Sequence, residues 1–146
     1  MRHSGFTKQE RNFITLMRTW VVAFLGAAAL FALIPGILLN YINDIGKVFL
    51  SWHSPAIAAG GEIWRVQAVV LNICLTYVCA IAQGSALRNA AYARIALLCT
   101  FACSAGFAAM IFADGPQFYY LAFAVAYGAA FLITLWFYGS SARSRS

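Results

Sequence analysis

Four long stretches of the chain lack aspartate, glutamate, lysine and arginine, and each consists mainly of apolar residues. They contain 25, 22, 19 and 28 residues and are bounded by Arg18 and Asp44, Arg65 and Arg88, Arg94 and Asp114, and Asp114 and Arg143. An α-helix rises about 1.5 Å per residue, so about 20 residues cross the hydrocarbon core of a bilayer. The pattern predicts four transmembrane helices with cores at about residues 20–39, 66–86, 95–113 and 118–137.

These apolar stretches are continuous and do not alternate with polar residues, which favours helices over the strands of a membrane barrel. Hydrophobic residues make up 63% of the 146-residue chain, and charged residues only 10%. A soluble domain carries about 25% charged residues, because it must present a hydrated surface. The predicted fold class is therefore all-α: a polytopic membrane protein in which residues 1–146 form a single domain, a bundle of four transmembrane helices.

The connection between the first two spans carries an amphipathic pattern at residues 41–53. Apolar and polar residues fall on opposite sides of a helix there: Ile42, Ile45, Phe49 and Trp52 on one, Asn43, Asp44, Lys47 and Ser51 on the other. The pattern is typical of a helix too short to span the bilayer and suited to lie in its interface. Just before it, Pro35 and Gly36 are expected to kink or end the first helix, because proline lacks an N–H group.

Eight of the ten lysine and arginine residues lie on one side of the predicted topology, together with both termini. The opposite side holds only Lys47 and Arg65. Short cytoplasmic segments are enriched in lysine and arginine, so both termini are predicted to be cytoplasmic. The cations do not form a basic face with interleaved aromatic residues, so the expected partners are membrane lipids and no nucleic acid is expected.

Polar residues of the second span fall on one stripe of the helix: Glu62, Arg65, Asn72, Thr76, Cys79 and Gln83. Polar groups at membrane depth turn toward the interior of a bundle, so this stripe is expected to face the other helices.

The last span carries two further patterns. Ala124 and Gly128 form a small-x-x-x-small motif that lets helix backbones approach closely. At the start of the span, Phe118, Tyr119 and Tyr120 are interpreted as an aromatic belt at the membrane interface.

Glu62 and Arg65 form the strongest candidate for a binding site. They lie one turn apart at the outer start of the second span, beside Trp64, where His53 and the charged residues of the amphipathic segment are expected to approach them. These groups, with Asn72 further along the same helix face, would suit a lipid headgroup or a small polar ligand. The favoured alternative is an ion pair that sets the depth of the helix and docks the loop, and the two roles are compatible.

The cysteines form a second candidate cluster, on the second and third spans. An antiparallel arrangement would place Cys79 level with Cys99, and Cys74 level with Cys103. Two such pairs would suit a disulfide, a soft-metal site or a redox relay. The favoured alternative is a structural role, because cysteine in an apolar helix behaves as a small hydrophobic residue.

Histidine and charge positions restrict the chemistry of the spans. The histidines, His3 and His53, both lie outside the spans, which excludes a haem held between two histidines within the bundle. No span has an ionisable carboxylate or base near its centre, which disfavours proton or ion pumping. We expect no cofactor and identify no catalytic residue.

Three motifs define the overall layout: Pro35-Gly36 late in the first span, Gly61-Glu62 with Trp64 opening the second, and Leu135-Trp136-Phe137-Tyr138 closing the last. Over residues 32–138 this layout resembles small bacterial four-helix integral membrane proteins, a family without an assigned reaction. The resemblance implies a multi-pass protein of the bacterial inner membrane and carries no catalytic residue across.

The expected function is a structural or accessory role, in which the protein packs with itself or with a larger membrane complex. The alternatives are binding or carrying a lipid-like or small amphipathic ligand in the outer half of the bundle and, third, thiol-based redox or metal chemistry.

Overall fold

The computed structural model describes residues 6–50, 61–84, 89–113 and 117–143, and the side chains of residues 49–50 and 61–64 lie outside this description. The described residues form five helices and no strand: α1 (Lys8–Leu33), α2 (Pro35–Leu50), α3 (Gly61–Ala82), α4 (Ala90–Ala113) and α5 (Phe118–Arg143). The all-α prediction is therefore confirmed for this part of the chain.

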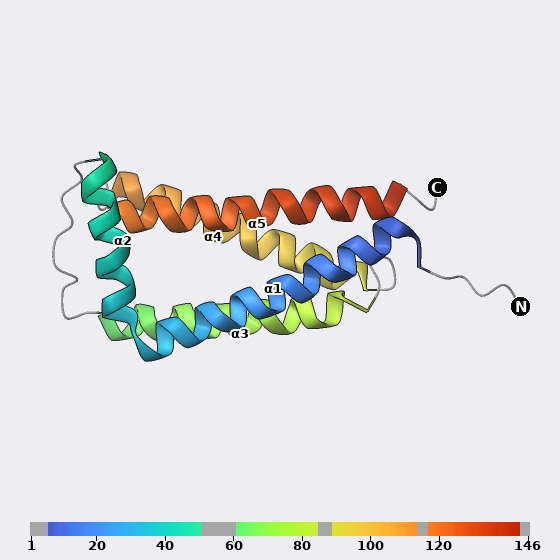
Figure 1. The fold of residues 1–146 in the computed structure, drawn as a ribbon, viewed down its shortest axis with the longest axis horizontal. Coiled ribbons are helices and arrows are strands. Elements are labelled where there is room, and N and C mark those ends of the chain that lie inside the picture. The colour runs from blue at the N-terminus through green and yellow to red at the C-terminus, as the bar shows by residue number, and fades with distance from the viewer. Residues whose placement is uncertain (1–5, 51–60, 85–88, 114–116, 144–146) are drawn as a thin grey trace, which may run out of the picture.

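Four of the helices are parallel or antiparallel to one another, and the fifth is not. Figure 1 shows α1, α3, α4 and α5 running along the long axis, with α2 crossing them at one end and both termini at the other. Each of the four long helices is long and apolar enough to cross a bilayer, which indicates a multi-pass membrane protein. The end crossed by α2 is termed the α2 end, and the opposite end the terminal end.

The boundaries of α1 differ from the predicted span at residues 20–39. Helix α1 begins in a capping box, in which the Glu10 N–H donates to Thr7 Oγ1 at 3.2 Å and the Thr7 N–H donates to the Glu10 carboxylate at 3.0 Å. It ends at Leu33, and Pro35 opens α2. Proline cannot continue the hydrogen-bond ladder of a preceding helix but fits the first turn of a new one. The bend expected at Pro35 is therefore a complete break, and residues 35–39 belong to α2.

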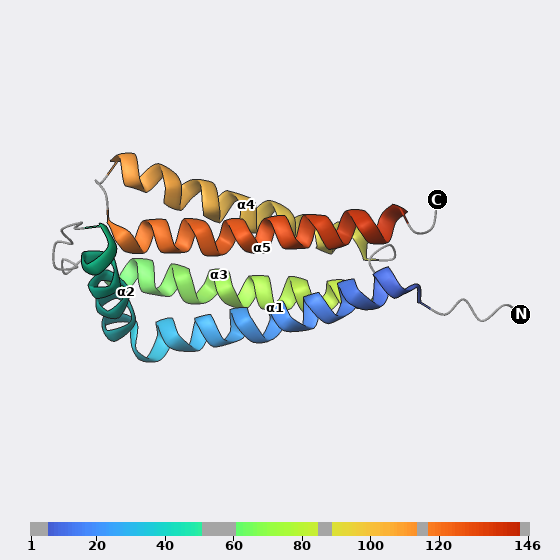
Figure 2. The same ribbon diagram turned by 45° about the horizontal axis from the view of Figure 1, so that its top comes forward.

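The long helices associate as two pairs. Helix α1 packs mainly against α3, and α4 against α5, while contacts between α3 and α4 and between α1 and α5 join the pairs (Figure 2). The α4–α5 contact uses the predicted small-residue motif: Ser104 Oγ donates to the Ala124 carbonyl at 2.8 Å, and a Cβ atom on Gly128 would lie 3.0 Å from that same Oγ. Glycine at residue 128 therefore allows the close approach that the motif predicted.

Polar side chains join helices inside the bundle. Asn72, on the predicted polar stripe of α3, is 1% exposed and accepts a hydrogen bond from the Tyr127 hydroxyl of α5 at 3.3 Å. Two turns further along the same side of α5, Trp20 Nε1 of α1 donates to Thr134 Oγ1 at 2.9 Å. Cys79 of the same α3 stripe is also buried. The inward orientation predicted for this stripe is thus confirmed at Asn72 and Cys79.

Several of the most deeply buried apolar side chains lie in the terminal half of the bundle. Phe13 and Met17 of α1 are fully buried there, against small side chains of α3 and α4 that include Ala82, Ala93 and Ala96. Small residues let the helices approach closely, which supplies van der Waals contact where lipid offers no hydrophobic driving force.

Candidate functional site

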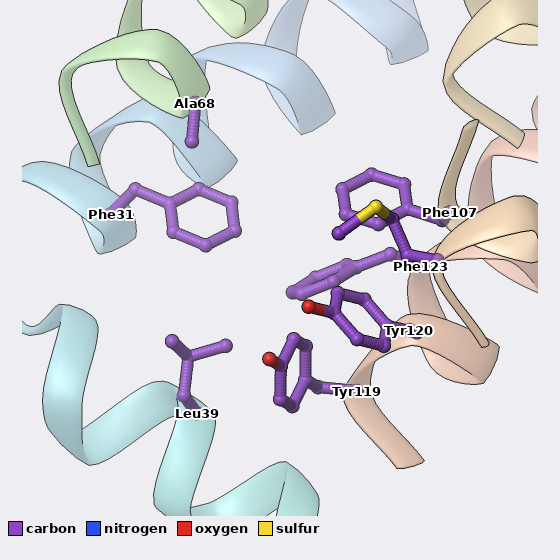
Figure 3. A pocket seen from close by; sticks show the side chains of 8 residues that line it. Phe31, Leu39, Ala68, Phe107, Tyr119, Tyr120 and Phe123 are labelled. Atoms are coloured by element: carbon purple, nitrogen blue, oxygen red, sulfur yellow. The ribbon is translucent and has the colours of Figure 1, made fainter. Parts of the chain in front are cut away.

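An apolar cavity lies between the helices at the α2 end. Its volume is about 310 Å³, and side chains from all five helices line it: Phe31, Leu39, Ala68, Phe107, Met110, Tyr119, Tyr120 and Phe123. Figure 3 shows the rings of α1, α4 and α5 and the Leu39 side chain of α2 converging on this space. None of these described lining residues is charged.

A second cavity of about 240 Å³ adjoins the first and extends further into the bundle. Four residues line both cavities: Phe31, Ala68, Phe107 and Phe123. The second is also lined by Gln67, Leu71 and Tyr127. Tyr127 donates its hydroxyl hydrogen to Asn72, so the predicted site residue Asn72 supports one wall of this second cavity.

Aromatic rings from three helices meet at this end. The ring centroids of Phe107 and Phe123 are 5.2 Å apart and those of Phe31 and Phe123 are 5.6 Å apart, with interplanar angles of 41° and 51°. Tilted contacts between aromatic rings are favourable, but they leave gaps beside the rings. A small side chain on the facing helix does not fill such a gap. On the α3 side of the first cavity, the described wall consists of the methyl group of Ala68. The cavity therefore results from large rings on three helices opposite a small residue on the fourth.

Helix α2 covers the end of the first cavity. Among the α2 residues whose side chains are described, the buried ones are Leu39, Asn43 and Gly46, which follow at spacings of four and three residues and share one face. A Cβ atom on Gly46 would overlap the Phe118 side chain, so glycine lets α2 lie directly against the start of α5. Asn43 was expected on the polar side of the amphipathic helix but is buried, because this close contact turns its face toward the bundle.

The outer face of α2 carries the charges. Lys47 and Asp44 form an ion pair of 2.8 Å, and their side chains are 59% and 67% exposed. Neither is paired with Arg65, so the described charges of α2 do not join it in the predicted cluster. The predicted partner His53, at the end of the amphipathic segment, lies outside the described residues, as do residues 51–52.

Arg65 binds the end of α1. Its Nε donates to the Phe31 carbonyl at 3.2 Å, and its Nη2 donates to the Ala32 carbonyl. The Phe31 carbonyl is the one that a residue at position 35 would bond in a continuous helix, and Pro35 has no N–H to do so. A cation at a helix C-terminus is also favoured by the helix dipole. Arg65 thus links the start of α3 to the end of α1, while the predicted ion pair with Glu62 stays a prediction.

The remaining members of the predicted cluster are not placed by the structure. The side chains of Glu62 and Trp64 lie outside the described residues, so a site formed by Glu62, Arg65, Trp64 and His53 stays a prediction. Asn72 lies deeper in the bundle, where its Nδ2 donates to the Ala68 carbonyl at 2.8 Å while its Oδ1 accepts from Tyr127. The structure thus places Asn72 beside the cavities rather than with the described charges.

The cysteines do not form two facing pairs. Cys79 is buried, and Cys99 and Cys103 pack against the same core cluster, but Cys74 is exposed. Cys79 follows Cys74 by five positions, which turns their side chains about 140° apart around the α3 axis. All four are free thiols, and the described residues contain no group of three or more His, Cys, Asp or Glu side chains placed to hold a metal ion.

The aromatic lining of the cavities was missed by sequence reasoning. Tyr119 and Tyr120 were interpreted as part of an interfacial belt, and no role was predicted for Phe31, Phe107 or Phe123. One sequence feature pointed to an inward-facing side of α5. Tyr120, Tyr127 and Thr134 recur every seven residues and so lie on one side of that helix. In the structure, Tyr120 lines the cavity while Tyr127 and Thr134 bond to other helices.

No family model, curated protein or solved structure matches the chain. The chemistry of the cavities is therefore the basis for assigning a function. Their described walls offer apolar surface, aromatic rings and a few uncharged polar groups. Such a site suits binding of an uncharged or amphipathic molecule and presents no nucleophile paired with a base.

Proposed function

We propose that this protein binds a lipid-like or small amphipathic molecule in the cavity beneath α2. The observation that supports this proposal is the cavity itself, about 310 Å³ in volume and lined from all five helices. Small-molecule sites have volumes of about 300–1,000 Å³ and combine apolar walls with few polar groups. A cavity of this kind in a well-packed bundle loses van der Waals contacts unless a ligand fills it.

A ligand from the lipid phase has a route to this site. Met110 of α4 lines the cavity and is 37% exposed, so one wall of the cavity reaches the outer surface of the bundle. A hydrophobic molecule in the bilayer would meet this surface directly, without passing through water.

We also propose a placement in the bacterial inner membrane, with the termini in the cytoplasm and α2 in the outer interface. The support is the distribution of eight cations toward the terminal side and two toward the α2 side. The exposed Lys47–Asp44 pair gives α2 a polar outer face, which suits the headgroup region. Reporter fusions at the C-terminus test this placement, and an external C-terminus would reject it.

The binding proposal is tested by filling the cavity. Ala68→Leu adds volume where the α3 wall is a single methyl group, and the matched control Ala23→Leu adds the same volume on the exposed face of α1. The proteins are purified in native lipid, and organic extracts are analysed by mass spectrometry. We expect a compound that is present with the wild type and Ala23→Leu and depleted with Ala68→Leu. Equal extracts from all three proteins would reject the proposal.

An accessory role is the second candidate, and the surface of α4 favours it. Ala102, Ala105, Gly106 and Ala109 are exposed there, and a Cβ atom on Gly106 would meet no atom within 4 Å. Small residues allow another helix to pack closely, either from a second copy or from a larger complex. Native mass spectrometry of the wild type and Gly106→Leu tests this role. An oligomer that Gly106→Leu dissociates is expected, and a monomeric wild type that co-purifies with no other protein would oppose the role.

A further inference from the structure

Tyr119 and Tyr120 differ chemically from the rest of the first cavity's wall. They are the first two cavity-lining residues of α5, and their ring centroids are 4.4 Å apart with an interplanar angle of 51°. Figure 3 shows both hydroxyl groups directed into the space between the helices, on the side that faces Leu39 and Phe31. Among the described lining residues, the two phenols supply the side-chain oxygen atoms of this cavity.

These hydroxyls restrict what binds well. A phenol donates one hydrogen bond, and a polar group buried by a ligand without a partner costs free energy. A straight alkyl chain in the cavity would cover the Tyr119 hydroxyl without accepting its hydrogen. A carbonyl oxygen, with two lone pairs and no donor, matches this phenol at the cavity wall.

The described wall of the cavity offers no positive charge to bind an anionic group. The described lining residues include no lysine, arginine or histidine. The nearby cation Arg65 donates to the Phe31 and Ala32 carbonyls at the end of α1, so its guanidinium is engaged by the backbone. A phosphate or carboxylate in the cavity would lose its hydration without gaining a counter-charge, which is a large cost.

The walls favour a flat ligand. Phe31, Phe107 and Phe123 form a connected set of rings around the space, and their pairwise angles of 41° and 51° present both faces and edges. Aromatic rings bind other rings through stacked and edge-to-face contacts that an alkyl chain does not make.

Building on the proposed function, we propose that the ligand is an uncharged planar ring compound with a carbonyl oxygen, such as an aryl ketone or a quinone. The ring lies among Phe31, Phe107 and Phe123, and the carbonyl oxygen accepts a hydrogen bond from Tyr119. Tyr120 completes the same wall beside it.

The test uses two probes that differ only in the carbonyl group. 9-Fluorenone is a planar aryl ketone that does not react with thiols, and fluorene is the corresponding hydrocarbon. Binding of each probe to the purified full-length chain is measured by equilibrium dialysis against detergent micelles alone. The variants are Tyr119→Phe, the matched control Tyr77→Phe on the exposed face of α3, and the filled-cavity variant Ala68→Leu. Gel filtration of each variant verifies that it is folded.

We expect fluorenone to bind the wild type more tightly than fluorene does. Tyr119→Phe should weaken fluorenone binding by about 3- to 10-fold, the effect of one net hydrogen bond, and leave fluorene binding unchanged. Tyr77→Phe should change neither, and Ala68→Leu should abolish both. Equal binding of the two probes, with no effect of Tyr119→Phe on either, would overturn the carbonyl proposal. It would leave the proposed function standing as long as Ala68→Leu still abolishes binding.

A third probe separates the remaining possibilities. If 1-dodecanol binds in an Ala68-dependent manner and neither ring compound does, the cavity accepts a chain and the ring proposal is overturned. If no probe distinguishes the wild type from Ala68→Leu, the proposed function fails together with the inference that rests on it.

Discussion

The terminal end and the α2 end of the bundle use side chains of different sizes between the same helices. At the terminal end, Phe13 and Met17 of α1 are fully buried against alanines such as Ala93 and Ala96 of α4. At the α2 end, the helices that face one another carry phenylalanine and tyrosine, and a cavity of about 310 Å³ remains between them. Ring pairs occur at both ends, since Phe13 contacts the Tyr138 ring of α5 with centroids 6.1 Å apart, but only at the terminal end do small side chains such as alanine join the same buried cluster.

The two ends also differ in how the chain is held together. At the terminal end, Ser141 Oγ of α5 donates to the Gln9 carbonyl of α1 at 3.1 Å. At the α2 end, the break at Pro35 sends α2 across the bundle, and Arg65 binds the carbonyls that the break exposes. The terminal end is therefore the more fully buried part of the bundle, and the α2 end contains the cavity in which we propose that a ligand binds.

The largest expected effect comes from truncating one ring at each end. Phe13→Ala removes a fully buried side chain and should lower the free energy of unfolding by about 3–5 kcal/mol. Phe123→Ala should cost less than half as much, because Phe123 is only partly buried and already faces a cavity. Unfolding in mixed detergent–SDS micelles measures both values. Equal losses would contradict the division between a stabilising end and a binding end.

A smaller effect is expected from the contact that positions α2. Gly46→Leu would drive a side chain into Phe118 and should lower the free energy of unfolding by about 1–3 kcal/mol, as overpacking does. Gly36→Leu, in the same helix, is the control because a Cβ atom there meets nothing within 4 Å. Thermal unfolding compares the two variants. If both behave alike, α2 does not depend on its close contact with α5.

Arg65→Met tests the link between α1 and α3 and is expected to have a similar or smaller effect. Removing the guanidinium leaves the Phe31 and Ala32 carbonyls without this donor and should cost about 1–3 kcal/mol. The control Lys47→Met breaks an exposed ion pair and should change the free energy of unfolding by about 1 kcal/mol or less. If Arg65→Met instead left the stability unchanged and removed an anionic lipid that co-purifies with the wild type, Arg65 would be a headgroup ligand rather than a docking residue.

The sequence allowed the helical class and the four long helices to be predicted, because a long uncharged apolar stretch is typical of a helix that could cross a bilayer. It did not locate the helix ends. Hydropathy locates the apolar part of a helix but not its ends. Helix α1 begins at Lys8, within a charged segment, and ends at Leu33, within an apolar segment. The local signals at these positions, the Thr7 capping box and Pro35, determine the boundaries instead.

The cavity could not be predicted from hydropathy or from local signals at helix ends. Tyr119 has the composition and position of an interfacial residue, and only the crossing of α2 over the bundle places it beside Leu39. The polar stripe of α3 was predictable because a single helix period defines it, and Asn72 lies where that period places it. A cavity that needs residues from five helices depends on how those helices pack, which no single period encodes.

The central claim, an apolar cavity between the helices at the α2 end, is tested most directly by adding the same side chain at each end. Ala68→Leu enters the cavity wall, whereas Ala96→Leu enters the tight core at a position that is 3% exposed. The free energy of unfolding of each variant is measured in the same detergent. We expect Ala96→Leu to lose about 1–3 kcal/mol and Ala68→Leu to lose nothing or to gain stability. Equal destabilisation by the two substitutions would contradict the presence of the cavity and with it the proposed binding site.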